Sequence, residues 1–338
     1  MCPSCRYRVI AMQQPLAAVV LKSGETMTII KTTAPEPGWT DRIVPFLGHK
    51  SELTRAAIRR AYDTGLDDLV MSDFLGVLPD GTVVGNITTV ESDGIAILQH
   101  VFTPPEHRRK GICTHLLQAL CEDFTTRGSR AVFLGTGYDS PPYHIYESFG
   151  FRGRGDSGKM TWVIDPTYPD GYFALASATV AETRWEDWPK LEALYALTGH
   201  WQLKSYLFQL LGHAGFEGEY PALLQRLDEG SMLQTLVMRT ASGAVVGHAM
   251  LGVEQTWRGR ALVLDLMVAP GFADQAGEML ASVRFPENRK LHAYCDERAA
   301  DKAALLEAAG FEHEGTLRRV MQDESHTPLD VLVYGRLT

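Results

Sequence analysis

This chain of 338 residues lacks the features that mark membrane proteins and nucleic-acid-binding proteins. No apolar run approaches the roughly 18 residues that a membrane-spanning helix needs, so we do not expect a membrane protein. Basic residues do not outnumber acidic ones, and the net charge of −9 disfavours nucleic acid or an anionic surface as the main partner. A negatively charged protein attracts a cationic ligand instead, such as an amine.

Cysteine is also scarce. Five cysteines, an odd number spread along the chain, form no disulfide framework and indicate a reducing compartment. The lone Cys2-x-x-Cys5 pair lacks the second pair of ligands that a zinc site needs, so we predict no metal. Residues 1–15 are predicted to be a disordered leader. Because the first residues contain no continuous apolar segment of a secretory signal, we expect a cytoplasmic protein.

Two nucleotide-binding motifs are missing from the most informative stretch of the chain, residues 101–117. It contains neither Gly-x-x-x-x-Gly-Lys-Ser/Thr nor Gly-x-Gly-x-x-Gly, which disfavours nucleoside triphosphates and dinucleotides. The stretch consists of the end of an apolar strand, a basic turn and the start of an amphipathic helix predicted for Thr114–Arg127. The first N–H groups of a helix have no intrahelical partners, and the helix dipole adds positive charge there. The turn therefore predicts a phosphate-binding site.

Arg108, Arg109 and Lys110 give this turn its charge, and Gly111 lets the main chain approach a ligand closely. The spacing Arg108-x-x-Gly111-x-Cys113 resembles the pyrophosphate loop of the GNAT superfamily of acetyl-CoA-dependent N-acetyltransferases, whose pattern is Gln/Arg-x-x-Gly-x-Gly/Ala. Cys113 stands where that family has Gly or Ala. The resemblance implies that acetyl-CoA is bound by Val101, Phe102, Thr103, Arg108, Arg109, Lys110, Gly111, Ile112, Cys113 and Asp139. The backbone N–H groups of residues 101–103 would polarise the acetyl carbonyl.

A second motif follows downstream. The segment Tyr146-Glu-Ser-Phe-Gly150-Phe151 resembles the Leu-Tyr-Glu-Lys-x-Gly-Phe signature of the same family, in which the Tyr protonates the departing CoA thiolate. A phenol with a pKa of about 10 suits that task, because it remains protonated at neutral pH. The alternative is that Tyr146 is only an aromatic side chain on the inner face of a helix.

Two departures from the family limit what the resemblance implies. Leu134 stands where the ribosomal-protein N-terminal acetyltransferases have a Glu that acts as the general base. Asp139 stands where the family commonly has an Asn. The resemblance therefore favours acetyl-CoA chemistry over acetylation of a protein N-terminus. The general base must come from elsewhere, and Gln99, His100 and His144 are the candidates by position. We predict His100, whose alternative role is that of a hydrogen-bonded structural residue.

The length of the chain exceeds the usual single domain of about 150 residues and suggests two domains. A polar connection at Asp165–Gly171 separates a catalytic GNAT domain, residues 16–166, from residues 172–338. Each half contains two strand-like runs joined by a turn. These predicted hairpins are Leu69–Leu78 with Val83–Val90 and Leu233–Arg239 with Val245–Val253.

The second half repeats the order of the first without its chemistry, which indicates a duplicated fold. Residues 271–277 lack the loop spacing and its basic residues, and Leu306 takes the place of the Tyr. We therefore predict an α/β protein of two GNAT-like domains, each a mixed, mainly antiparallel twisted sheet flanked by helices. The degenerate C-terminal domain either builds part of the acceptor pocket or serves only as a scaffold.

Two further segments have both functional and structural interpretations. Arg55 and Arg59 lie one turn apart on the helix predicted for Glu52–Tyr62, where they either hold an acceptor carboxylate or form a solvated face. A helical segment is predicted for roughly Trp185–Leu211. Its tryptophans either stack on a planar ligand or belong to the core.

The sequence thus predicts an N-acetyltransferase that uses acetyl-CoA as cosubstrate and acts on a primary amine of a small molecule. In the mechanism that the resemblance implies, the amine attacks the acetyl carbonyl directly, without a nucleophilic residue. Three alternatives remain: transfer of a longer acyl group, a non-catalytic acyl-CoA-binding regulator, and a hydrolase that uses Cys113. The identity of the acceptor and the oligomeric state, a homodimer included, are left open.

Overall fold

The computed structural model describes residues 13–255 and 261–338, so the Cys2-x-x-Cys5 pair and most of the predicted leader lie outside the described residues. Strand β1 begins at Gln13, inside the range predicted as leader. Contacts divide the described chain into two compact units, residues 13–92 with 98–129 and residues 93–97 with 130–338. Strand β5, Ile95–Phe102, contributes residues to both.

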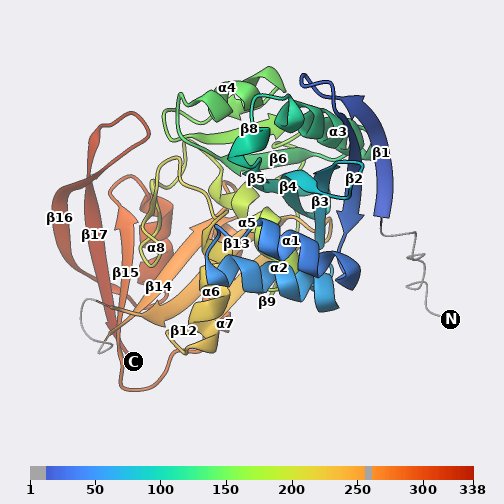
Figure 1. Ribbon diagram of the computed structural model, residues 1–338. Coiled ribbons are helices and arrows are strands. Elements are labelled where there is room, and N and C mark those ends of the chain that lie inside the picture. The colour runs from blue at the N-terminus through green and yellow to red at the C-terminus, as the bar shows by residue number, and fades with distance from the viewer. Residues whose placement is uncertain (1–12, 256–260) are drawn as a thin grey trace. The chain divides into compact units, whose positions relative to one another are not determined.

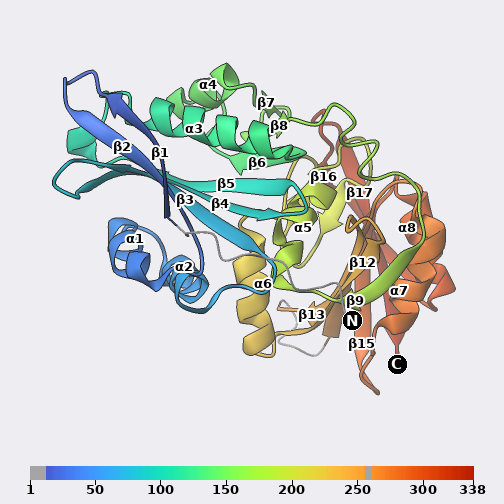
Figure 2. The same ribbon diagram turned by 90° about the vertical axis from the view of Figure 1, so that its right-hand side faces the viewer.

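The first unit is a sheet with helices on both faces. Antiparallel pairs join β1 to β2, β2 to β3 and β3 to β4. Strand β5 follows β4 in the strand order. Helix α3 lies on one face, and α1 and α2 lie on the other (Figure 2). The elements are β1 (Gln13–Val20), β2 (Thr26–Thr33), α1 (Thr40–Phe46), α2 (Glu52–Thr64), β3 (Val70–Val77), β4 (Val83–Ser92), β5, a short 3-10 turn at Pro105–His107, and α3 (Ile112–Arg127). The first predicted hairpin and the predicted helix at Thr114–Arg127 are confirmed.

Helix α3 packs closely on the sheet because β4 has a glycine beneath it. A Cβ on Gly85 would lie 2.5 Å from Cγ2 of Ile112 and 3.0 Å from Cδ1 of Leu116. The helix ends at Gly128, whose φ of 68° is the left-handed conformation that favours glycine. These two glycines set the distance of α3 from the sheet and its length.

The second unit contains the remaining strands of the first sheet and a whole second sheet (Figure 1). Strand β6 runs parallel to the start of β5, with Ile95–Ile97 paired to Ala131–Phe133, and the order continues through β8 to β7. The elements are β6 (Ala131–Gly135), α4 (Pro141–Ser148), β7 (Arg152–Gly153), β8 (Lys159–Val163), β9 (Ala178–Glu182), α5 (Trp188–Tyr195), β10 (Leu203–Ser205), β11 (Leu210–Leu211), α6 (Glu219–Asp228), β12 (Met232–Thr240), β13 (Val245–Val253), β14 (Ala261–Val268), α7 (Ala276–Ser282), β15 (Lys290–Asp296), α8 (Ala300–Ala308), β16 (Glu312–Gln322) and β17 (Pro328–Leu337).

The two large sheets have the same topology. The first has the order β2-β3-β4-β5-β6-β8-β7, preceded by β1, and the second has the order β9-β12-β13-β14-β15-β17-β16. Element for element the chain order corresponds, and the pairs β5–β6 and β14–β15 are both parallel. Figure 2 shows α5 and α6 on one side of the second sheet and α7 and α8 on the other. The predicted fold class, mixed α/β with two mainly antiparallel sheets flanked by helices, is confirmed.

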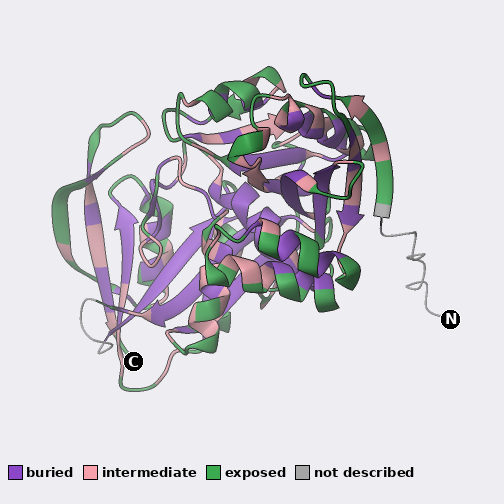
Figure 3. Cartoon of the chain, in the orientation of Figure 1, coloured by how far each residue is buried: buried purple, intermediate pink, exposed green. Residues whose placement is uncertain are grey.

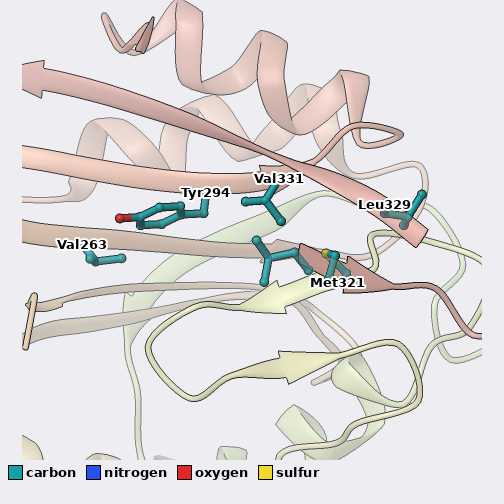
Figure 4. Close-up of a cluster of buried hydrophobic side chains, with 6 residues drawn as sticks. Val263, Tyr294, Met321, Leu329 and Val331 are labelled. Carbon is teal, nitrogen blue, oxygen red and sulfur yellow. The ribbon is translucent and has the colours of Figure 1, made fainter. Parts of the chain in front are cut away.

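One segment of the second unit departs from the prediction. The helix expected for Trp185–Leu211 ends at Tyr195, and the chain then forms the short strand β10. Leu203 of β10 enters a buried cluster that Figure 4 shows around Tyr294. The other members of the cluster are Val263, Met321, Leu329 and Val331. Strand β10 therefore belongs to the core of the second sheet.

Two buried carboxylates hold this segment against β14 and β15. Asp265 on β14 accepts hydrogen bonds from the Ser205 hydroxyl at 2.6 Å and from the next two backbone N–H groups at 2.9 and 2.8 Å. Asp296, at the end of β15, accepts from the backbone N–H groups of Gln202 and Leu203 at 2.9 and 3.1 Å. The pairing of β14 with β15 ends at Leu264 and Ala293, so the segment contacts both strands where they part.

Burial follows the layers of the second unit. Strands β13 and β14 are almost wholly buried, whereas the edge strand β16 is largely exposed (Figure 3). Trp185 and Trp188 are buried, and Trp188 stacks on Tyr220 at 5.7 Å between ring centroids, which supports their interpretation as core residues. Among the residues that the structure describes, no helix is both long and apolar enough to cross a membrane.

Candidate functional site

The backbone of strand β5 leaves the extended conformation at His100, and we call this irregularity the bulge of β5. This residue has a φ of 53°, a conformation that is uncommon for a residue other than glycine. Its carbonyl oxygen accepts a hydrogen bond of 3.2 Å from Nδ2 of Asn86 on β4. Burial, together with the positive charge of Lys50 and the nearby His49, lowers the pKa of His100 to about 4. The imidazole is therefore neutral at neutral pH, the form that can accept a proton.

The loop between α1 and α2 covers this part of β5. The ring of His49 lies 4.1 Å from the ring of Phe102, and Phe46 meets the same ring edge-on at 5.3 Å. Burial, followed by Lys50, lowers the pKa of His49. The prediction missed these side chains. Their signal was a histidine in a short loop between two helices.

The basic turn leads into α3. Among the described residues, no side chain forms a capping hydrogen bond at the N-terminus of this helix. Gly111 is the N-cap residue with a φ of 91°, and its carbonyl accepts the first helical hydrogen bond, from His115 at 3.1 Å. A Cβ on Gly111 would meet nothing closer than 3.7 Å, so the backbone conformation and not space requires glycine. The N–H groups of Ile112 and Cys113 follow directly in the first turn of the helix.

The three basic side chains of the turn differ in their partners. Nε of Arg108 donates to the carbonyl of Thr103 at 3.0 Å, which closes the turn. Nζ of Lys110 pairs with Glu25 at 2.9 Å, in the hairpin between β1 and β2. Arg109 is exposed, has a φ of 63°, and has no ion pair among the described residues. Lys110 is therefore the cation of this turn that is paired with a carboxylate, and Arg109 is the one whose guanidinium also makes no hydrogen bond among the described residues.

The cysteines near the turn are poor nucleophiles. Burial raises the pKa of Cys113 to about 11, and burial followed by Glu122 raises the pKa of Cys121 to about 12. Both remain thiols at neutral pH, whereas nucleophilic attack needs the thiolate. This opposes the alternative of a hydrolase that uses Cys113.

Tyr146 belongs to the second unit and is 6% exposed. It lies on α4, a helix capped by Ser140, whose hydroxyl accepts from the N–H of Tyr143 at 3.4 Å. Its ring meets the ring of Phe151 edge-on at 5.8 Å. Its carbonyl accepts from the N–H of Phe151 at 3.2 Å, across Gly150, which has a φ of 95°. The Gly-Phe pair therefore ends the helix and holds Tyr146 in place.

Asp139 lies on the surface just before α4, and His144 lies on the exposed side of α4 itself. Asp139 has a φ of 53°, and its carboxylate lies 3.0 Å from Nε2 of His144. The other ring nitrogen of His144 lies 2.9 Å from Glu147. The bond to Glu147, followed by the charge of Asp139, raises the pKa of His144. Because the proton is held by two carboxylates, His144 is a weaker candidate for the base than His100.

The second unit has cavities of about 360 and 660 Å³, and each is large enough for a small ligand. The larger of these two lies at the tip of the β7–β8 hairpin. The N–H of Thr136 donates to the carbonyl of Gly158 at 2.9 Å, so this tip lies at the end of β6 from which the chain continues to α4. The lining residues are Asp156, Ser157, Lys159, Leu211, Gly212, His213, Ala214, Arg319, Val320, Met321, Gln322, Asp323, Glu324 and His326. Both the hairpin and the segments around the second sheet therefore form its walls.

Ion pairs fasten the hairpin to those segments. Nη2 of Arg154 lies 2.8 Å from Oε1 of Glu192 on α5, and both side chains are almost fully buried. Nζ of Lys159 lies 3.3 Å from Glu217 and is partly buried. Removal of one partner of a buried ion pair strongly destabilises the folded protein, because the other charge remains in a poorly solvated site.

Comparisons with known proteins give one family match and several similar solved structures. Residues 48–151 match the family model described as acetyltransferase (GNAT) family. An N-acetyltransferase from Staphylococcus aureus Mu50 is a similar solved structure, with 19% identity, 48% of this chain and 98% of that chain covered, and a TM-score of 0.39. A ribosomal-protein-alanine N-acetyltransferase from Brucella melitensis has 23% identity, coverage of 47% and 99%, and a TM-score of 0.38.

A spermidine N-acetyltransferase from Vibrio cholerae, solved in complex with CoA and spermine, has 16% identity, coverage of 48% and 95%, and a TM-score of 0.37. No curated protein sequence matches the chain. The family match contains the bulge, the basic turn, α3 and the motif of Tyr146. The similarity to the acetyltransferase (GNAT) family is therefore shown for residues 48–151.

Proposed function

We propose that this protein is an N-acetyltransferase that transfers the acetyl group of acetyl-CoA to a primary amine of a small molecule. The observation that carries the proposal is the basic turn, in which Gly111 opens α3 and Arg109 stays exposed without an ion pair among the described residues. Backbone N–H groups at a helix start and an arginine bind phosphate oxygens by charge-assisted hydrogen bonds. The pyrophosphate of acetyl-CoA fits this turn.

The chemistry follows from the groups on β5 and α4. The lone pair of the amine attacks the acetyl carbon, and the N–H groups of residues 101–103 stabilise the negative charge that develops on the carbonyl oxygen. His100, neutral at neutral pH, takes the proton that the amine loses. When the tetrahedral intermediate collapses, the C–S bond breaks and Tyr146 donates its phenolic proton to the CoA thiolate.

The second sheet is a degenerate GNAT-like domain in this proposal, and it contributes to the acceptor pocket. Its shared strand order with the first sheet supports the duplication. The cavity at the tip of the β7–β8 hairpin supports the role in acceptor binding, since residues 211–214 and 319–326 form much of its wall. The net charge of −9 favours an acceptor that carries an ammonium group, and we keep the prediction of a cytoplasmic enzyme.

Calorimetric titration with acetyl-CoA tests the proposal first, on wild type, on Arg109→Ala and on the control Arg59→Ala, which removes another exposed arginine. We expect Arg109→Ala to weaken binding about 10-fold, the value of one charge-assisted hydrogen bond, and Arg59→Ala to bind like wild type. A screen of primary amines for release of the CoA thiol then identifies the acceptor. Binding without turnover on any amine would indicate the acyl-CoA-binding regulator, and lack of binding would refute both functions.

A further inference from the structure

A chain of buried polar side chains connects helix α2 to the bulge of β5 within the first unit. The hydroxyl of Tyr62 donates to Oδ2 of Asp73 at 2.7 Å, and the hydroxyl of Thr88 donates to Oδ1 of the same carboxylate at 2.5 Å. Nδ2 of Asn86 donates to the Thr88 hydroxyl oxygen at 3.0 Å and to the carbonyl of His100 at 3.2 Å. Except for His100, all of these side chains are fully buried.

The direction of every hydrogen bond in this chain follows from Asp73. An ionised carboxylate only accepts, so both hydroxyl groups must point their protons at it. The Thr88 oxygen then has only lone pairs left for Asn86, which turns the NH₂ end of the Asn86 amide toward Thr88 and toward the carbonyl of His100. A neutral residue at position 73 would remove this constraint, because the Thr88 proton could then turn toward Asn86.

The second sheet contains the same cluster without a charge. Gly85 on β4 and Gly247 on β13 pair with Gly76 and Met238, respectively, so the position of Asp73 corresponds to Thr235. By the same register, Asn86 corresponds to His248.

The partners of His248 complete the neutral cluster. The hydroxyl of Tyr195 on α5 lies 3.1 Å from Nδ1 of His248, and Thr235 lies 2.9 Å from Nε2. Burial lowers the pKa of His248 to about 3, so the ring is uncharged. A tyrosine from the covering helix thus reaches a buried polar group in both sheets, and the second sheet forms without a carboxylate at the position that corresponds to Asp73.

The Asp73 carboxylate therefore costs folding free energy, and the strand topology does not require it. Burial raises the pKa of Asp73 to about 6, which means that the charged form is disfavoured in the folded protein. The titratable group that faces it is Tyr62 from α2, whose pKa burial raises well above its usual range, while its partners from β4 are uncharged. The sheet that carries the basic turn has this charge, and the sheet without the turn has a threonine in its place.

We infer that Asp73 is a positioning residue for the transfer reaction, which holds the His100 carbonyl through Thr88 and Asn86 and so fixes the bulge of β5. The inference rests on the proposed function, because the bulge presents both the base and the N–H groups of residues 101–103 to the acetyl group. A misplacement of these groups by about 1 Å costs roughly 100-fold in rate. The acetyl-CoA phosphates, which bind at the basic turn, do not depend on this chain of hydrogen bonds.

The test compares Asp73→Asn with Asp265→Asn, a buried aspartate of the second sheet that is remote from the bulge in sequence and serves β10. With saturating amine, we expect Asp73→Asn to lower kcat roughly 100-fold and to leave KM for acetyl-CoA within about two-fold. Its melting temperature at pH 8 should equal or exceed that of wild type, since a disfavoured charge is removed. Asp265→Asn should lower the melting temperature and keep kcat.

The kcat values of two Thr88 variants provide a second test, which separates the hydrogen bond from a general loss of stability. Thr88→Ser keeps the hydroxyl and should retain kcat, whereas the isosteric Thr88→Val should lower it as Asp73→Asn does. Because the two side chains act through one chain of hydrogen bonds, the double variant should lose no more than either single variant.

Three results would overturn the inference. An unchanged kcat in Asp73→Asn would show that the carboxylate does not act on the bulge. A loss of kcat that parallels a loss of melting temperature, with Thr88→Val fully active, would show a purely structural role. If wild type binds acetyl-CoA but acetylates no amine, the proposed function fails first, and the inference fails with it.

Discussion

The two sheets share one strand order but differ where their parallel strands part. In the first, the pairing of β5 with β6 stops at Ile97, and β5 continues through a bulge at His100 toward the basic turn. In the second, β14 and β15 part after Leu264, and the chain's own strand β10 is bound there by Asp265 and Asp296. The same topology thus leads into the basic turn in the first sheet, whereas in the second sheet the place where the strands part is filled by strand β10. The second sheet therefore differs from the first by an added segment as well as by the residues that it lacks.

The largest effect is expected at Tyr146 on α4, whose place on α8 is taken by Leu306. Tyr146→Phe removes the proton donor for the CoA thiolate and should lower kcat by roughly 100- to 1,000-fold with little change in KM for acetyl-CoA. Steady-state thiol-release assays measure it. Tyr143→Phe, on the same helix and also buried, is the matched control and should stay within about three-fold of wild type. Equal losses in both variants would refute the assignment of Tyr146.

The second effect concerns the segment that fills the second sheet. Asp265→Asn replaces a charged acceptor of three hydrogen bonds by an amide, and we expect a loss of about 3 kcal/mol in the free energy of unfolding. Gln99 takes the corresponding position in β5, and no hydrogen bond of its Nε2 is found among the described residues. Gln99→Ala should cost less than about 1 kcal/mol. Urea unfolding of both variants measures the difference, and equal losses would contradict the role of Asp265.

A smaller effect is expected at the glycines that end α4 and α8. Gly150 and Gly310 have φ angles of 95° and 80°, so an alanine at either position should cost about 1 to 2 kcal/mol. A Cβ on Gly150 would also lie 3.3 Å from the Trp162 ring, whereas on Gly310 nothing would be closer than 3.9 Å. Gly150→Ala should therefore be the more destabilised in urea unfolding. The reverse order would show that the two helix ends are not equivalent.

The smallest effect is a difference in acid sensitivity. The pKa of His248 is about 3 and that of His100 about 4 in the folded protein, both below the ordinary value of 6.5. The unfolded chain therefore binds more protons below pH 6.5, and stability falls as the pH falls until it reaches the folded pKa. His248→Asn should lose less stability between pH 6.5 and 3 than His100→Gln does, by about 1 kcal/mol. Thermal unfolding across that range measures it, and identical profiles would contradict the burial of His248.

The sequence predicted the elements whose signals are local. The turn residues between β3 and β4, the helix after the basic turn, and the Gly-Phe pair after Tyr146 all appear where they were expected. The segment after Tyr195 could not be predicted, because β10 exists through hydrogen bonds to Asp265 and Asp296, which lie far along the chain. Helical spacing of apolar residues contains no information about such partners.

The candidate site was predicted in part, for the same reason. A basic turn and a short signature are contiguous, and the comparisons with GNAT proteins cover both. Asp73 was missed because a single carboxylate in an apolar strand has no motif, and only the structure shows that it is buried and therefore needs partners. The roles of Tyr146, His100, Asp139 and the residues of the turn stay predictions until the variants are measured.

The ion pair between Arg154 and Glu192 has a consequence for the dissection of this protein. Arg154 precedes the polar connection at residues 165–171, and Glu192 follows it, yet their side chains are buried together. A fragment that ends in the connection would carry a guanidinium without its counterion, and the complementary fragment would carry an uncompensated carboxylate. The two fragments are therefore expected to be poorly soluble when expressed apart and to recover only when they are produced together.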